Sequence, residues 1–129
     1  MRSPQFRQPL DPVRVALEGG LRGAVVTPSL HICAAIVSPS ANRLLAFTSN
    51  GALLWQHDMG GSPFSFCAFT LRLSPSGTLW LGLEDRICAF DEDGHAWGEV
   101  LIDFGPRERL GNFLPTQDGF FVSIFKDGY

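Results

Sequence analysis

The residues best suited to chemistry lie in one short run, Asp91-Glu92-Asp93-Gly94. Carboxylates at alternate positions before a glycine suit the start of a calcium-binding loop, which makes Asp91 and Asp93 the calcium candidates of this chain. Such a loop also needs a bidentate glutamate at its twelfth position, and Ile102 stands there instead. Because a hairpin turn accounts for the same residues, we expect neither a bound metal nor a cofactor.

The histidines and cysteines show no metal-binding spacing. The three histidines are His31, His57 and His95, and they are far apart in the sequence. The second and third fall near the predicted fourth strands, at the outer edges of successive blades, where we expect exposure to solvent. The three cysteines are widely separated and have apolar neighbours: Cys33, Cys67 and Cys88. We expect buried free thiols, which favour a reducing compartment. The sequence also lacks a nucleophile elbow and a glycine-rich phosphate loop, so no catalytic residue is assigned.

The densest cluster of charge is Arg107-Glu108-Arg109, which follows Gly105-Pro106. A charged cluster after Gly-Pro is typical of a solvated loop. Loops that connect packed sheets also bind partners, so these three residues form the candidate partner-binding loop of the chain.

The elements that must position these residues carry an internal repeat. Residues 43–51 and 86–94 share the order Arg, Ala, Phe, Gly at a spacing of 43 residues, and a tryptophan follows each copy. A period of about 40–45 residues with short strands is typical of a β-propeller blade. In a blade, small residues let sheets approach, glycines allow turns and tryptophans bury apolar area. The echoed residues with these expected roles are Ala46, Gly51, Trp55, Ala89, Gly94 and Trp97.

Strand and turn signals divide the chain into a tail and a repeat array. Residues 1–22 are predicted to be a proline-rich tail with a lead-in strand at 13–17. Residues 23–129 are predicted to be an all-β, partial propeller of four-stranded antiparallel blades that does not close into a ring. We place its repeats at about 23–60, 64–103 and 108–129.

The hairpins set the expected length of the array. Asn50-Gly51 and Asp93-Gly94 predict two-residue turns of type I′. Aligning Gly119 with Gly77 starts a third copy that stops before its last hairpin. Repeats bury their faces only against neighbours, so we expect a fragment of a longer propeller or a chain that self-associates.

The repeated segment, residues 43–51 and 86–94 with the tryptophan after each copy, resembles the quinoprotein-type, or PQQ-like, propeller repeat. In that repeat, Ala-x-Asp precedes a turn that ends in Gly and is followed by a Trp. The copies here run from Ala46 to Trp55, with Thr48 in place of the Asp, and from Ala89 to Trp97. Residues 74–82 are also similar to the repeat of WD40-like and sensor-type propellers. The resemblance covers roughly residues 23–129 and implies stacked blades with the tryptophan docked between them.

The bulk composition narrows the function. The 129 residues are 45% hydrophobic with a net charge of −3, which argues against disorder and against nucleic acid as a partner. No apolar run is long enough to span a membrane. We expect a non-enzymatic interaction scaffold that binds a protein partner or itself, in the cytoplasm, or exported if the chain belongs to a longer one. The alternatives are the ligand-sensing propeller of a receptor and part of a quinone-dependent dehydrogenase.

Overall fold

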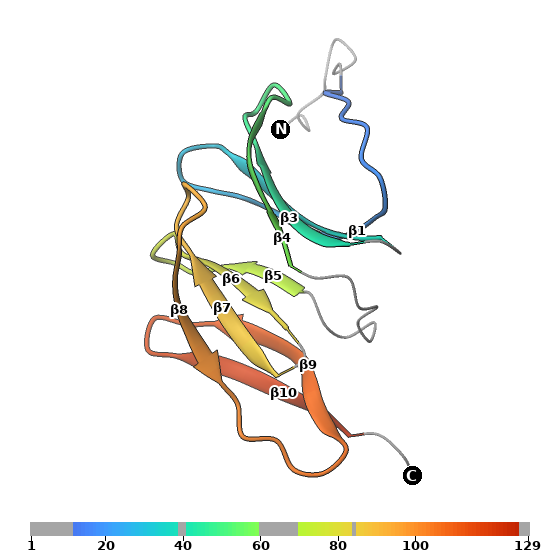
Figure 1. Cartoon of the computed structure of the whole chain (residues 1–129). Coiled ribbons are helices and arrows are strands. Elements are labelled where there is room, and N and C mark those ends of the chain that lie inside the picture. Colours follow the sequence, from blue (N-terminus) through green and yellow to red (C-terminus); the bar gives the residue numbers. More distant parts are fainter. Residues whose placement is uncertain (1–11, 39–40, 60–69, 84, 127–129) are drawn as a thin grey trace, which may run out of the picture.

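The computed structural model describes residues 12–38, 41–59, 70–83 and 85–126, and these residues form an all-β fold of antiparallel strands without a helix (Figure 1). Sheet I has the order β1-β2-β3-β4, sheet II has the order β5-β6-β7-β8, and a two-stranded unit, hairpin III, contains β9 and β10. Neighbouring strands follow one another along the chain, as in propeller blades. The expected fold class, an incomplete propeller-like array, is confirmed.

The strand bounds match the expected order of short strands and turns. Those of sheet I are β1 (Gly20–Val26), β2 (Ile32–Val37), β3 (Asn42–Phe47) and β4 (Leu53–Asp58). Those of sheet II are β5 (Thr70–Leu73), β6 (Leu79–Gly82), β7 (Arg86–Phe90) and β8 (Ala96–Leu101). Hairpin III consists of β9 (Glu108–Pro115) and β10 (Phe120–Lys126).

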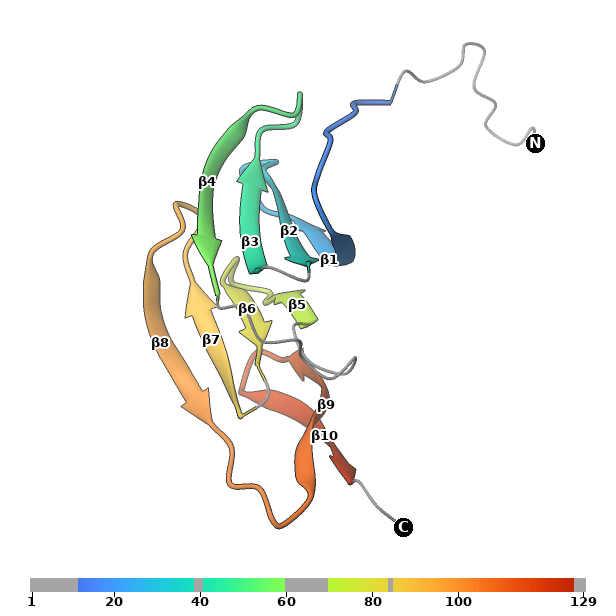
Figure 2. The ribbon, with the colours of Figure 1, turned by 45° about the vertical axis from the view of Figure 1, so that its right-hand side comes forward.

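The three units stack face to face, as Figure 2 shows from the side. We call the face of sheets I and II that points toward hairpin III the forward face, and the opposite face the back face. The back face of hairpin III lies against sheet II, and its forward face points away from sheet II. The forward face of sheet I packs on the back face of sheet II, where Cys33, Leu44, Leu79 and Leu81 are fully buried. Strands β2 and β3 are covered on both faces, which explains why Ile32–Val37 and residues 44–47 are continuously apolar instead of alternating.

The second interface repeats the first. The forward face of sheet II packs on the back face of hairpin III, with Ile87, Leu110 and Phe113 at its centre. A Cβ at Gly82 would lie 2.8 Å from the Phe113 ring, so glycine is required for this close packing.

Residues that repeat at a spacing of 43 therefore occupy the same face in sheets I and II. Leu44 and Ala46 lie on the forward face of sheet I, and their counterparts Ile87 and Ala89 lie on the forward face of sheet II. Ala46 and Ala89 are both fully buried, consistent with their expected role as small residues between sheets.

The predicted hairpins form, but their turn type is different. Type I′ requires positive φ at both central residues. Gly51 and Gly94 have φ of 93° and 87°, whereas the positive-φ residues other than glycine in the described chain are Leu30 and Arg107, not Asn50 or Asp93. The observed turns instead bond the fourth residue to the first, as in Gly51 N–H to the Thr48 carbonyl at 3.0 Å, and place glycine in the left-handed region.

The N-terminal segment also differs from expectation. The predicted lead-in strand at 13–17 is not a strand, and β1 begins only at Gly20. Leu17 packs on the back face of sheet I, and a Cβ at Gly51 would lie 2.9 Å from the side chain of Val13. Alternation of apolar residues here serves packing on a sheet face, without a partner strand. The first eleven residues of the proline-rich tail lie outside the described residues.

The third copy is shorter by one residue than the predicted alignment. The loop closes with Thr116 N–H donating to the Gly119 carbonyl at 2.8 Å, and Gly119 lacks the positive φ of Gly77. Phe120 and Val122 consequently pack inward, and Phe121 occupies the forward-facing position of Trp80 in sheet II. The alignment of Gly119 with Gly77 was wrong because a two-residue loop replaces a three-residue one. The proposed match of Asp127 with Asp85 lies outside the described residues.

Candidate interaction surface

Strand β4 of sheet I contacts the β7–β8 turn of sheet II, and we call this contact of Trp55 and His57 with Glu92 and Gly94 the seam between sheets I and II. Trp55, on β4, donates its indole N–H to the Glu92 carbonyl at 2.9 Å. A Cβ at Gly94 would lie 2.6 Å from the Trp55 ring, so the indole rests directly on the β7–β8 turn. His57 donates from Nε2 to the Gly94 carbonyl and lies between the rings of Trp55 and Phe90. Trp55 therefore docks between units as predicted.

His57 was expected to face solvent, and that prediction was wrong. The residue is half-buried because strand β4 lies beside the β7–β8 turn of the next sheet. His95, by contrast, is exposed as expected.

A second contact joins the same turn to sheet I. The backbone N–H and the hydroxyl of Ser29 both donate to the Glu92 carboxylate, at 3.1 and 2.6 Å. The hydroxyl of Ser29 is the main cause that lowers the pKa of Glu92, because it stabilises the ionised form. The charged turn of sheet II is thus held against the β1–β2 turn of sheet I.

The calcium candidates have a turn-building role in the structure. The Asp91 carboxylate accepts from the backbone N–H of Asp93 and of His95, both at 2.9 Å, and lies 3.1 Å from the His95 ring. The backbone N–H of His95 is the main cause that lowers the pKa of Asp91. Although side-chain atoms of Asp91, Asp93 and His95 lie within 4.8 Å of one another, these hydrogen bonds account for their proximity. We assign no metal to them.

The thiols behave as packing groups. Cys33 is fully buried in the core between sheets I and II, and burial raises its pKa to about 11. Cys88 is half-buried on the back face of sheet II, which packs on sheet I, and burial raises the pKa of this thiol as well. Both are free, as predicted, and the prediction for Cys67 concerns a residue outside the described range.

The predicted partner-binding loop is only partly a loop. Arg107 lies in an exposed turn with a φ of 66°, whereas Glu108 and Arg109 begin strand β9. The Glu108 carboxylate accepts from the backbone N–H of Gly105 and thereby closes the turn. Two of the three charges therefore belong to a strand, which the Gly-Pro signal alone did not indicate.

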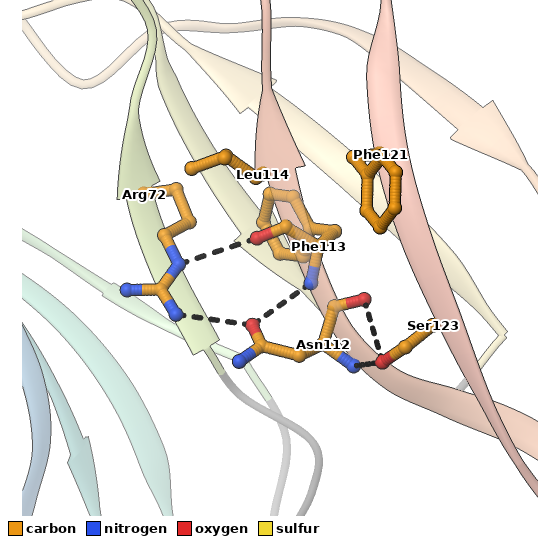
Figure 3. A pocket seen from close by; sticks show the side chains of 6 residues that line it. All are labelled: Arg72, Asn112, Phe113, Leu114, Phe121 and Ser123. Carbon is orange, nitrogen blue, oxygen red and sulfur yellow. Dashed lines mark hydrogen bonds between the residues drawn. The ribbon is translucent and has the colours of Figure 1, made fainter.

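The largest exposed aromatic side chains are instead on the forward faces at the C-terminal end. Phe121 and Leu114 are cross-strand neighbours on hairpin III and are 73% and 57% exposed. They line a shallow hollow of about 290 Å³ (Figure 3). The equivalent forward faces of sheets I and II are covered by the next unit. In the described structure, no strand covers this third forward face.

Polar groups fix the inner rim of this hollow. Arg72, on β5, donates to the Phe113 carbonyl at 3.3 Å and to the Asn112 side-chain oxygen at 3.1 Å. The hydroxyl of Ser123 bonds the Asn112 backbone across the hairpin (Figure 3). The hollow is thus an apolar floor with a preformed polar edge, which suits protein binding. Its residues were missed in the sequence because the apolar run 120–125 reads as a strand buried on both faces.

Trp97 is the second exposed aromatic residue at this end. The pairings of β3 with β4 and of β7 with β8 have a bulge at the same place, so Trp97 holds the position of Leu54, and Gly98 is the structural counterpart of Trp55. It lies edge-on against Trp80, with ring centroids 5.7 Å apart, and is 59% exposed. The predicted docking of Trp97 between blades is not made within the described residues.

Neither the known protein-family models nor the curated proteins gave a match to this chain. Within the described residues there is no helix that is long and apolar enough to cross a membrane. The exposed forward face of hairpin III is therefore the feature from which a function can be inferred.

Proposed function

We propose that this chain is a non-enzymatic interaction scaffold, built from propeller repeats of the PQQ-like or WD40-like type, that binds a second copy of itself. The observation that carries the proposal is the uncovered apolar forward face of hairpin III, with Leu114 and Phe121 at its centre. Exposed apolar side chains that gather at a hollow on one sheet face favour an interaction surface.

The second copy is favoured because the chain presents both halves of an interface that it already makes twice. Inside the chain, forward faces pack on back faces. Hairpin III exposes a forward face. The back face of sheet I is covered in part by the segment that contains Leu17, but it keeps an apolar hollow of about 290 Å³ lined by Leu21, Ala24 and Ile32. A forward face on a back face is a heterologous contact, which makes rings or longer arrays.

The polar clusters support a binding role over a catalytic one. In the described residues, Asp91 builds a turn, Glu92 joins sheets I and II, and Glu108 closes the turn before β9. Each of these groups has a structural partner that explains its position.

The test is the mass of the protein in solution. We expect the wild-type chain to associate reversibly as its concentration rises. The double variant Leu114→Ser/Phe121→Ser should weaken that association by about tenfold or more, because it removes the apolar centre of the contact. Sedimentation equilibrium measures both. Leu101→Ser, which changes a leucine on strand β8 that is even more exposed than Leu114, is the matched control and should associate like the wild type. A wild-type chain that stays monomeric and unfolds cooperatively at every concentration would contradict the proposal.

A further inference from the structure

We propose that residues 13–17, which we call the strap, compete with the second copy for the back face of sheet I and thereby limit self-association. This role rests on the proposed function, because it assigns a regulator to the same contact. The strap lies shortly before strand β1 in the described chain, so the competitor is part of the molecule itself.

The first observation is that the strap lies where a neighbouring sheet lies at the internal interface. In sheet II, Leu79 and Leu81 are fully buried on the back face, under the forward face of sheet I. The strand register places Ile32 and Ala34 at the equivalent positions of sheet I. The strap residue Leu17 packs on the buried cluster that contains Ala34. The strap therefore takes part of the place that a forward face takes between sheets I and II.

The second observation is that the strap and the second copy need the same space. Three strap residues line the apolar hollow of about 290 Å³ on this back face: Val13, Val15 and Leu17. A forward face that packs on Ile32 and Ala34 must fill this hollow, and two stacked sheets leave no room for a further layer of side chains between them. Binding of the second copy and binding of the strap therefore exclude each other.

The third observation is that the strap is held mainly by half-exposed side chains. Val13 is 56% exposed and Val15 is 39% exposed. Residues 13–17 form no strand, so in the described structure no ladder of backbone hydrogen bonds joins them to sheet I. A segment with few buried apolar contacts and no ladder opens at a low free-energy cost. A second copy can therefore displace the strap without unfolding sheet I.

The fourth observation is a fixed point at the end of the strap. The guanidinium of Arg43, on β3, donates from Nη2 to the Glu18 carbonyl at 2.9 Å. Gly19 has a φ of 117°, and a Cβ there would lie 2.7 Å from the Val37 carbonyl oxygen. Glu18 and Gly19 therefore hold the chain close to sheet I, and release is confined to the residues before them.

The first test weakens the strap without changing the sheet. We expect Val13→Ser/Val15→Ser to strengthen self-association by about threefold or more in sedimentation equilibrium, because release raises the fraction of chains with an open back face. The matched control Ala16→Ser changes an exposed strap residue that does not line the hollow and should associate like the wild type. Adding Leu114→Ser and Phe121→Ser to the strap variant should remove the gain, because the gain depends on the forward face of hairpin III.

The second test follows the strap in the wild-type chain. Arg14 is an exposed trypsin site within the strap. We expect cleavage after Arg14 to become about twofold faster or more when the protein concentration rises into the associating range, because cleavage follows the population of the opened segment. Mass spectrometry measures the product that begins at Val15. A synthetic peptide of residues 8–20, present in the same solution, reports the trypsin activity at each concentration.

Two outcomes would overturn the role of the strap and leave the proposed function intact. One is a strap variant that associates no more tightly than the wild type. The other is cleavage after Arg14 that is unchanged or slower in the associated protein. The second test needs no substitution, so it decides the matter even if the strap variant unfolds. If neither the wild type nor the strap variant associates, the proposed function itself fails, and the competition fails with it.

Discussion

A single side chain at the start of each turn explains why these hairpins form. Four residues accept the backbone N–H of the residue four positions later, at 2.9–3.1 Å: Thr27, Thr48, Ser74 and Asp91. Short oxygen-bearing side chains favour such turns because they replace one backbone acceptor. Three of the four turns then place glycine in the left-handed region, and the first places Leu30 there, with a φ of 63°.

Leu30 is therefore a strained position whose relief should stabilise the protein. A residue with a Cβ pays about 1 kcal/mol or more in this conformation. We expect Leu30→Gly to raise the free energy of unfolding by about 0.5–1 kcal/mol, because the side chain is exposed and contributes little packing. Chemical denaturation measures it. The reverse change, Gly77→Leu in the equivalent turn, should destabilise, and equal effects of the same sign would refute the argument.

At the scale of elements, the seam between β4 and the β7–β8 turn holds sheets I and II in register. Trp55 covers Gly94 so closely that any side chain there must displace the indole. The interaction joins residues from different sheets, so it sets the relative position of the units.

This seam yields a prediction with an internal control. Gly94→Ala should lower the free energy of unfolding by about 2 kcal/mol or more, because the Cβ collides with Trp55 and the φ of 87° is unfavourable for alanine. Gly98→Ala, on the adjoining strand β8, has open space around the new Cβ and should change stability by less than about 0.5 kcal/mol. Thermal unfolding of both variants decides the matter, and similar losses would count against the seam.

At the scale of the whole molecule, three stacked units share two cores, and no described strand covers the forward face of hairpin III. Stacked repeats are stabilised mainly by their neighbours, so the sheets should respond together to a change at their common interface. The bond between Ser29 and Glu92 is such a point, since it joins the turns of sheets I and II.

Acid should weaken this connection between sheets. The pKa of Glu92 is lowered from 4.5, so its stabilising effect is present above about pH 4.5 and is lost as the pH falls through the lower folded-state pKa. We expect Ser29→Ala to cost up to about 1 kcal/mol at pH 7, limited by solvent exposure, and to cost much less once the pH falls below the folded-state pKa of Glu92. Urea denaturation of wild type, Ser29→Ala, Glu92→Gln and the double variant measures the coupling. A cost that does not change with pH would disprove it.

The sequence predicted the parts of the fold that local chemistry controls. Short oxygen-bearing residues and glycines marked the hairpins, and continuous apolar runs marked strands buried on both faces. The recurrence of alanine at positions 46 and 89 predicted where adjacent sheets come close together. These signals are local because a turn residue depends on the backbone conformation of its own turn, and an apolar run depends on the pattern of side chains within one strand.

Only the tertiary structure decided how these parts meet. Residues 13–17 alternate like a strand but pack on a sheet face, and the predicted third copy shifted by one residue because its loop is shorter. His57 became half-buried against a turn 37 residues away, whereas Phe121, in an equally apolar run, stayed exposed. Burial depends on which unit lies opposite, and that is a property of the stacking. The repeated segment thus determined which residues form the strands and turns of the sheets. The packing of those sheets on one another decided which faces remain exposed.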